Sequence, residues 1–325
     1  MKAIVYTKYG PPDVLELKEV EKPAARDNEV LVKVRAASVN FPDWSLLRGK
    51  PFIVRLMSGG LLKPKNKILG ADIAGRVEAV GRNAKQFRLG DEIFGDISAC
   101  GSGGFAEYVS VPENALALKP ASTTFEEAAA VPMTAVVALQ GLRDKGQVQP
   151  GQKVLINGAS GGIGTFAVQI AKSFGAEVTG VCSTRNVDMV RSIGADQVID
   201  YTREDFTQNE QRYDLILAAG GYRSIFDYQS ALSPKGIYVM AGGSMAQIFQ
   251  AILLGPWISM TGSKKMGNLA AKPNPQDLFF VKELVETGKV VPVIDRRYPL
   301  REAAEALRYY GEGHARGKVV ITVEA

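Results

Sequence analysis

The feature that most constrains the fold is a glycine-rich turn between an apolar strand pattern and a helix pattern, "VLINGASGGIGTFAVQIAKSFG", residues 154–175. Gly158, Gly161 and Gly164 are each three residues apart. Glycines let such a turn bend tightly and approach a pyrophosphate, whose charge is favoured by the free N–H groups of the helix N-terminus. The strand–turn–helix context therefore predicts a dinucleotide-binding α/β fold. The predicted pyrophosphate contacts are Ser160, Gly161, Gly162, Ile163 and Gly164.

The sequence around this turn alternates between strand and helix patterns. Strands are predicted at residues 153–158, 177–182, 197–200, 213–219 and 236–242, with helical segments between them. Strands that are apolar on both faces and separated by helices indicate a parallel sheet covered on both sides, which is a doubly wound domain. Upstream of it, Ser122 or Thr123 is predicted to cap a helix that has Glu126 and Glu127 in its first turn.

The first 120 residues or so differ in character, with short alternating strands and frequent Gly and Pro turns. This pattern favours a compact β-barrel-like domain, and the β-rich tail after residue 290 is interpreted as rejoining it. We therefore expect one domain from residues 1–122 and 290–325, and a second from 123–289. The apolar run at residues 249–260 is too short to span a bilayer and contains Gly255-Pro256, so it is interpreted as a buried helix end followed by a strand.

The composition is that of an ordinary globular protein, with 325 residues, 46% apolar and 22% charged. The net charge of +5 is too dilute to indicate nucleic-acid binding by itself. Cys100 and Cys182 cannot build a disulfide framework, which favours a reducing, cytoplasmic location.

The end of the second predicted strand suggests which dinucleotide binds. In NAD-selective sites an acidic residue about 20 residues after the glycines accepts from the ribose 2′-hydroxyl, whereas here Ser183, Thr184 and Arg185 stand at the strand end. Arg185 can pair with a 2′-phosphate in fork geometry, so NADPH is predicted as the cofactor. Two alternatives stay open: Arg185 is a solvated residue that begins the next helix, and Tyr201 is either a flank of the adenosine or a half-buried strand-end aromatic.

The sequence offers little acid–base or metal chemistry. One histidine, His314, and two distant cysteines cannot form a structural zinc site, and no credible catalytic set of ligands is present. A hydride carrier with so few acid–base groups suits reduction of an already electrophilic, conjugated acceptor, where hydrogen-bond donors stabilise the developing oxyanion. It suits zinc-dependent alcohol oxidation poorly.

Several further motifs complete a pattern that covers essentially the whole chain: "MKAIVYTKYGPPDVLEL", "VRAASVNFPDW", "LGADIAGRVEAVG", "GGFAEYV", "AAAVPMTAVVAL", "IGADQVIDY" and "GKVVI". In combination they resemble the zinc-independent medium-chain dehydrogenase/reductases of the quinone oxidoreductase and alkenal/one oxidoreductase type. The resemblance implies a GroES-like barrel completed by the C-terminal tail, a Rossmann domain between its two parts, and a homodimer formed through the Rossmann sheet edge near "GPWISMTG". Where zinc-dependent relatives carry ligands, near Asn40-Phe41 and Ala71-Asp72, this sequence has no Cys or His.

The resemblance also assigns roles to single residues. Asn40 is implied to face the nicotinamide and substrate, with an amide that can donate to a carbonyl oxygen, and Asp43 to organise its loop. Thr134 is implied near the nicotinamide ribose, and Lys318 on the nicotinamide side. The family's usual tyrosine beyond Asn40 is replaced by "PDWSLLRG", which leans toward enone reduction and leaves Ser45 as a weak second polarising group. The other implied cofactor contacts are Ser183, Thr184, Arg185, Tyr201, Ala219, Gly220, Gly242 and Gly243.

The function expected from these features is NADPH-dependent reduction of quinones or α,β-unsaturated carbonyls without zinc. An enoyl-thioester reductase would use the same chemistry and stays open as an alternative. A third reading is an NADPH-binding protein with little turnover, acting as a structural protein, a nucleic-acid binder or a peripheral membrane partner. No integral membrane segment is expected.

Overall fold

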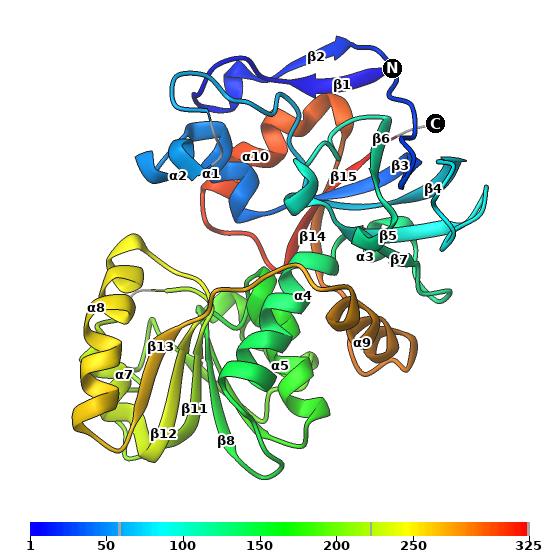
Figure 1. Cartoon of the computed structure of the whole chain (residues 1–325). Helices are drawn as coiled ribbons and strands as arrows, with labels where there is room; N and C mark the ends of the chain where they lie inside the picture. Colours follow the sequence, from blue (N-terminus) through cyan, green and yellow to red (C-terminus); the bar gives the residue numbers. More distant parts are fainter. Residues whose placement is uncertain (58–59, 222, 324–325) are drawn as a thin grey trace. The chain divides into compact units, whose positions relative to one another are not determined.

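The computed structural model describes residues 1–57, 60–221 and 223–323, and the chain divides into two compact units. The first unit comprises Met1–Met133, Pro273–Glu286 and Pro292–Ala325. The second comprises Thr134–Lys272 and Thr287–Val291. Figure 1 gives the labels of the helices and strands used below.

The second unit contains the predicted doubly wound sheet. Its strands are β8 (Lys153–Asn157), β9 (Glu177–Cys182), β10 (Gln197–Asp200), β11 (Tyr213–Ala218), β12 (Leu232–Met240) and β13 (Lys265–Asn268). They are all parallel and lie in the order β10-β9-β8-β11-β12-β13. The strand order therefore reverses between β8 and β11, and ligands of open α/β sheets bind at the carboxyl ends of strands at such a switch point. The prediction of a parallel sheet is confirmed.

Helices precede or connect these strands and bury their apolar stripes on the sheet. They are α4 (Pro132–Leu139, which continues as a π-helical turn, Gln140–Lys145), α5 (Gly162–Ser173), α6 (Val187–Ser192), α7 (Ile225–Ala231) and α8 (Met245–Thr261). In Figure 1, α5 lies on one side of the labelled strands and α7 and α8 lie on the other. Phe166 and Ile170 of α5 are fully buried, and on the α7 side the rings of Tyr228 and Tyr238 stack with centroids 4.6 Å apart. This packing fixes the strand ends that form the candidate site.

Helix α8 corrects the interpretation of residues 249–260, which are neither a helix end nor a strand. The helix continues through Gly255-Pro256 to Thr261. Gly255 is tolerated because a Cβ there would lie 2.7 Å from the carbonyl oxygen of Met266, so only glycine lets the helix approach β13 this closely. Phe249, Leu253, Trp257 and Met260 are exposed rather than buried. Within the described ranges, no helix combines the length and the apolar content needed to cross a bilayer.

The first unit is built on β-sheet. Its strands are β1 (Lys2–Val5), β2 (Glu16–Glu19), β3 (Glu29–Val39), β4 (Asp72–Val80), β5 (Glu92–Asp96), β6 (Tyr108–Pro112), β7 (Leu116–Leu118), β14 (Ile294–Pro299) and β15 (Lys318–Thr322). The main sheet has the order β14-β15-β3-β4-β5-β7, with β6 also paired to β3, and β1 pairs with β2. The antiparallel pairing of β15 with β3 places Val319 opposite Val39. The C-terminal tail thus rejoins the N-terminal strands, as predicted.

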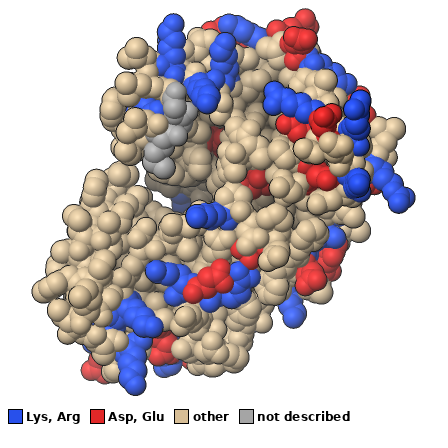
Figure 2. Space-filling model, in the orientation of Figure 1, with Lys and Arg blue, Asp and Glu red and all other residues tan. Residues whose placement is uncertain are grey.

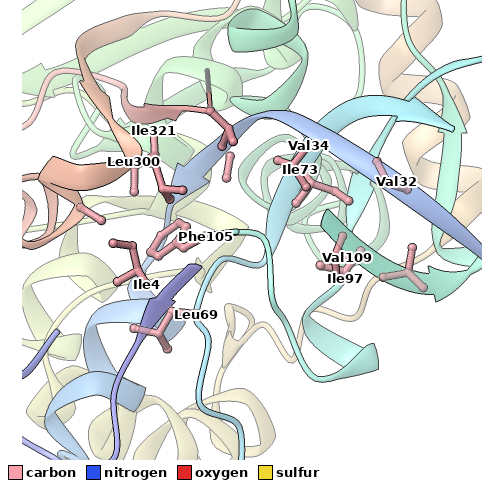
Figure 3. Packing of buried hydrophobic residues seen from close by; sticks show 14 of the residues in the cluster. Ile4, Val32, Val34, Leu69, Ile73, Ile97, Phe105, Val109, Leu300 and Ile321 are labelled. Atoms are coloured by element: carbon pink, nitrogen blue, oxygen red, sulfur yellow. The ribbon is translucent and has the colours of Figure 1, made fainter. Parts of the chain in front are cut away.

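Alternating residues of β3 fill the core of this unit. Val32 and Val34 are buried together with Ile73 of β4, Phe105 and Val109, and Figure 3 shows these side chains gathered on one side of the β3 ribbon and its neighbours. Such period-two burial is the signal from which the strands were predicted. The remaining helical elements of the unit are α1 (Phe41–Arg48), α2 (Phe52–Met57), α3 (Phe125–Ala129), α9 (Pro275–Glu286), α10 (Ala303–Gly311) and the short turns Pro12–Val14, Ser98–Cys100, Glu113–Ala115 and Leu300–Glu302.

Helix α3 is capped by Thr124, not by Ser122 or Thr123. The N–H of Glu127 donates to Thr124 Oγ1 at 3.2 Å, and the Glu127 carboxylate accepts from the Thr124 N–H at 2.8 Å, which forms a capping box. The helix packs on β3, β4 and β15. The first unit therefore extends to Met133, beyond the expected domain boundary at residue 122.

Candidate active site

The glycine turn lies between β8 and α5, at the switch point of the parallel sheet. Gly158 has a φ of +83°, a conformation that favours glycine. A Cβ on Gly164 would lie 2.0 Å from the carbonyl oxygen of Gly158, so the first turn of α5 packs directly on the loop. Around Gly161, in contrast, only one atom lies within 4 Å of a built Cβ, the Gly158 oxygen at 3.6 Å. The surface at the α5 N-terminus is therefore open to a ligand, and its N–H groups favour an anion.

The residues predicted at later strand ends lie beside this turn. The N–H groups of Ala219 and Gly220 donate to the carbonyl oxygen of Asn157, at 2.9 and 3.1 Å, and a Cβ on Gly158 would lie 2.7 Å from the Gly220 nitrogen. Gly242 follows β12, and a Cβ there would lie 2.7 Å from the Ala219 oxygen. The structure thus brings the glycine turn, Ala219-Gly220 and Gly242-Gly243 together as one cradle of bare backbone, which a dinucleotide pyrophosphate fits.

Asn186 is a residue of this cradle that sequence reasoning missed. Its Nδ2 donates to Ser160 Oγ at 3.0 Å and to Ser183 Oγ at 3.2 Å, so it ties the glycine turn to the end of β9. Within the described residues, its Oδ1 is buried without a hydrogen-bond partner. A buried acceptor without a donor is uncommon and marks a place where a bound group or a water completes the site. Its only sequence signal was its position one residue after Arg185.

The end of β10 brings a carboxylate to the end of β9, which corrects the expectation that Ser183, Thr184 and Arg185 stand there in place of an acidic residue. Asp200 Oδ2 accepts from Thr184 Oγ1 at 2.5 Å, and its Oδ1 accepts from Thr202 Oγ1 at 2.8 Å. These hydrogen bonds, that of Thr184 first, hold the pKa of Asp200 below its usual range, so the carboxylate is ionised. The Thr184 hydroxyl therefore already donates to Asp200, and the cation beside this carboxylate is Arg203, whose Nε lies 3.5 Å from Asp200 Oδ2. Tyr201 follows directly and is exposed.

The first unit holds a second group of predicted residues, centred on Asn40. Asn40 follows β3 and precedes α1, and 2% of it is exposed. Its Nδ2 donates to Asp72 Oδ2 at 2.9 Å and to the Ser38 carbonyl oxygen at 3.3 Å, while its Oδ1 accepts from Lys318 Nζ at 2.5 Å. Both amide protons thus already have acceptors. Donation to a substrate carbonyl, as the resemblance implies, requires one of these bonds to be released.

Asp72 and Lys318 form a buried ion pair beneath Asn40. Lys318 Nζ lies 3.6 Å from Asp72 Oδ2, and both side chains are nearly inaccessible. Burial raises the pKa of Asp72, against the lowering effect of the Lys318 charge, and burial lowers the pKa of Lys318. Ser38 Oγ and the N–H of Met133 also donate to the Asp72 carboxylate, at 3.1 and 3.0 Å. The two charges therefore face each other, and both side chains also have hydrogen-bond partners inside the barrel. This is the condition under which a buried ion pair is tolerated.

Asp43 organises the loop, as expected. One of its carboxylate oxygens accepts from the Asn40 N–H and the other from the Gly70 N–H, both at 2.9 Å. Burial raises the pKa of Asp43 to about 6, although these two donors lower it.

Ser45 Oγ donates to the Pro42 carbonyl oxygen at 3.1 Å, so its proton is used within α1. Thr134 opens the second unit in α4 and is mostly buried.

Comparison with known proteins places this fold and these residues in a family. Residues 26–121 match the alcohol dehydrogenase GroES-like domain, and residues 193–321 match the zinc-binding dehydrogenase domain. The chain is 33% identical to the chloroplast envelope quinone oxidoreductase homolog of Arabidopsis thaliana, over 99% of this chain and 98% of the relative. The chain is a medium-chain dehydrogenase/reductase. This reductase is also 32% identical to the chloroplastic NADPH-dependent alkenal/one oxidoreductase of A. thaliana, over 99% of the chain and 79% of that protein.

A solved structure agrees with this assignment. The quinone oxidoreductase from Coxiella burnetii superposes with a TM-score of 0.87 at 30% identity, covering 100% of this chain and 99% of that one. The first unit of this medium-chain dehydrogenase/reductase is thus the GroES-like domain and the second is the Rossmann domain, as the resemblance implied. The family type, with quinone oxidoreductases and alkenal/one oxidoreductases, is confirmed.

No group of three or more His, Cys, Asp or Glu residues in the described part of this reductase is arranged to hold a metal ion. Cys100 is exposed and Cys182 is buried, and burial raises the pKa of both thiols, that of Cys182 to about 11. Neither is therefore an activated nucleophile. His314 lies on the surface, in the loop that leads into β15.

Proposed function

We propose that this chain is a reductase that transfers hydride from NADPH to quinones or α,β-unsaturated carbonyls and uses no zinc. The observation that carries the proposal is the open glycine cradle at the switch point of the sheet, in a chain similar over almost its whole length to a quinone oxidoreductase homolog and an alkenal/one oxidoreductase. The bound coenzyme supplies the hydride.

The residues around Asn40 account for the electrostatic part of the reaction. Reduction of a conjugated carbonyl or a quinone places negative charge on the acceptor oxygen, which hydrogen-bond donors stabilise. Lys318 donates to the Asn40 amide oxygen, and a cation at that position draws charge from the amide and strengthens Nδ2 as a donor. The bond from Nδ2 to the Ser38 oxygen is the longer of its two, so it is the one that a substrate oxygen is expected to replace.

The preference for NADPH rests on Arg185 at the end of β9. A guanidinium pairs with a phosphate in fork geometry, and Ser183 lies beside it. Asp200 opposes this preference, because its ionised carboxylate lies against Thr184 at the same edge. We propose that Arg185 outweighs it.

The proposal of a zinc-independent reaction rests on Asp72, which stands next to the position where zinc-dependent relatives carry a histidine. Its two oxygens accept from Ser38, Asn40 and the Met133 N–H and face the Lys318 ammonium. The Asp72 oxygens thus already accept hydrogen bonds within the barrel, and the Lys318 ammonium lies beside them. We infer that they do not serve as zinc ligands.

The test is to follow NADPH and NADH oxidation with a panel of quinones, enones, alkenals and a crotonyl thioester, after a fluorescence titration has shown that the protein binds the coenzyme. Turnover of quinones or enones with NADPH, unchanged by chelators, is the expected outcome. Coenzyme binding without turnover of any acceptor would count against the proposed reaction, and turnover of the thioester alone would favour the enoyl-thioester alternative. Homodimerisation at the β13 edge and a cytoplasmic location stay predictions, the first tested by light scattering.

A further inference from the structure

Residues 48–67 of the GroES-like unit form a segment of unusual charge, called the basic segment below. It contains six Lys and Arg residues and no Asp or Glu. It includes the last residue of α1, all of α2 and the loop that leads toward Leu69. The rest of the chain mixes both signs of charge, with 34 acidic residues in total, so this run is a local concentration of positive charge.

The same segment exposes large apolar side chains. They are Phe52, Ile53 and Leu56 of α2, and Leu61 and Leu62 of the following loop. Leu62 is 87% exposed, and Phe52 and Leu56 are each 63% exposed. Single exposed apolar residues need no explanation, but five within eleven positions of one segment mark an interaction surface.

Contacts at Gly49, Arg55 and Gly60 hold the described parts of the basic segment on the rest of the unit. Arg55 Nε donates to the Gly49 carbonyl oxygen at 3.0 Å, and its guanidinium lies 4.6 Å from the centre of the Tyr9 ring. Tyr9 OH donates to the Gly60 carbonyl oxygen, and Pro64 is buried. Arg55 therefore serves the fold, and the exposed lysines of the segment supply its outward charge.

Four lysines of the segment are free to meet a partner: Lys50, Lys63, Lys65 and Lys67. All are exposed, and within the described residues none lies within ion-pair distance of a carboxylate. In Figure 2 the upper left of the surface, where α1 and α2 lie in Figure 1, carries several blue side chains among tan ones. Positive charge interleaved with exposed Leu, Ile and Phe complements a surface that is anionic at its boundary and apolar beneath it.

We infer that the basic segment docks this protein on an anionic lipid surface, with Phe52, Leu56, Leu61 and Leu62 entering the headgroup boundary and the lysines contacting lipid phosphates. A second copy is a poorer occupant, because a symmetric contact through this segment would bring like charges together. The exposed face of α8 differs in this respect: its 17 residues carry no charge, and the corresponding area in Figure 2 is tan. No charge on α8 attracts an anionic surface, and its C-terminal part belongs to the expected dimer edge, so that face serves as the control.

The experiment is sedimentation of the full-length protein with vesicles of phosphatidylcholine alone, and of phosphatidylcholine with phosphatidylglycerol. We expect binding to the anionic vesicles only, weakened by salt because the Debye length falls from about 10 Å at 0.1 M to about 3 Å at 1 M. The paired variant K63E/K65E is expected to bind at least about 25-fold more weakly, since each lysine near an anionic surface contributes roughly fivefold. L61S/L62S is expected to lose most of the remaining apolar contribution.

Two matched controls separate this surface from general effects. K85E/K289E makes the same change in net charge at exposed lysines outside the segment, and L253S/M260S removes exposed apolar side chains from α8. Both are expected to bind vesicles like the wild type, and coenzyme binding by every variant verifies folding. The inference is overturned if the wild type does not bind anionic vesicles, or if the controls lose binding as much as K63E/K65E. It is also overturned if the wild type is a dimer without affinity for vesicles and L61S/L62S dissociates it, because the segment would then be a subunit interface.

Discussion

Lys318 Nζ lies 2.5 Å from Asn40 Oδ1, although 278 positions separate the two residues in the sequence. Asp72 completes this arrangement by accepting from Asn40 Nδ2 and pairing with Lys318. The three side chains come from three different strands or strand ends, and each forms a hydrogen bond or an ion pair with the other two. Asn40 is therefore held in one orientation by a buried network whose parts are individually costly to remove.

Lys318→Met is expected to destabilise the protein by about 3–5 kcal/mol near neutral pH, because it leaves the Asp72 carboxyl buried without its cation. The loss should grow as pH rises. Burial already raises the folded-state pKa of Asp72 above its unfolded value, and removing Lys318 raises it further. In the variant, the stability that protonated Asp72 contributes below its unfolded pKa is therefore lost as pH rises through this higher folded-state pKa. Urea unfolding at about pH 6 and about pH 8 measures the difference.

The double variant K318M/D72N provides the control for this pair. It removes both charges, so it should be clearly more stable than the sum of the two single losses predicts. Additive losses would mean that the two groups do not interact, in conflict with the geometry described above.

Gly161→Ala and Gly164→Ala form a matched pair at the glycine turn. The Gly161 methyl group would meet only the Gly158 oxygen, at 3.6 Å, so we expect stability within about 1 kcal/mol of the wild type but weaker coenzyme binding, because the methyl stands on the open cradle. The Gly164 methyl group would lie 2.0 Å from a backbone oxygen, so that variant should lose both stability and binding. Thermal unfolding and coenzyme fluorescence titrations distinguish them. Equal coenzyme affinity in Gly161→Ala and the wild type would speak against the cradle.

Arg185→Ala is expected to weaken NADPH binding by about 2 kcal/mol, roughly 30-fold, and to leave NADH binding nearly unchanged, since only NADPH has the 2′-phosphate that a guanidinium would pair with. Calorimetric titration of both coenzymes measures the effect. Arg203→Ala serves as the control, because Arg203 is largely exposed and lies 3.5 Å from Asp200. Equal losses for the two coenzymes would remove Arg185 from the proposed phosphate site.

Asp43 gives a prediction about pH. Its folded-state pKa of about 6 lies above its ordinary value of 3.8, so the protonated form is stabilised by folding. Relative to Asp43→Asn, the wild type should therefore lose stability as pH rises from 3.8 to about 6, by at most about 3 kcal/mol. Urea denaturation of both proteins across this range tests it. If the wild type instead gains on the variant with rising pH, the two backbone donors outweigh the cost of burial.

The parts of this fold that sequence could predict are those set by local pattern. Five strands of the parallel sheet have apolar runs, and the glycine turn is a local motif, so these were found. Strand β13 (Lys265–Asn268) has no such run and was not predicted. Helix α8 was misread because Gly255-Pro256 usually ends a helix. Gly255 is instead required by a distant contact with Met266 of β13, and no local signal reports that contact.

The same distinction holds for the candidate site. Ser183, Thr184 and Arg185 follow one strand and could be grouped, whereas Asp200 follows the neighbouring strand, and only the pairing of β9 with β10 brings it to Thr184. Asp72 was overlooked because a single acidic residue in an apolar strand carries no pattern. Its role depends on Lys318, which arrives only through the pairing of β15 with β3.

The position of Lys318 on β15 has a consequence for biosynthesis. While the ribosome is still adding the residues before β15, the barrel lacks the strand that pairs with β3, and Asn40 and Asp72 have no cation between them. The six strands of the Rossmann sheet and the residues of its glycine cradle all precede Pro273, so they are synthesised before β15. The buried network of Asn40, Asp72 and Lys318 can therefore form only once β15 has been made, later than every residue of the glycine cradle.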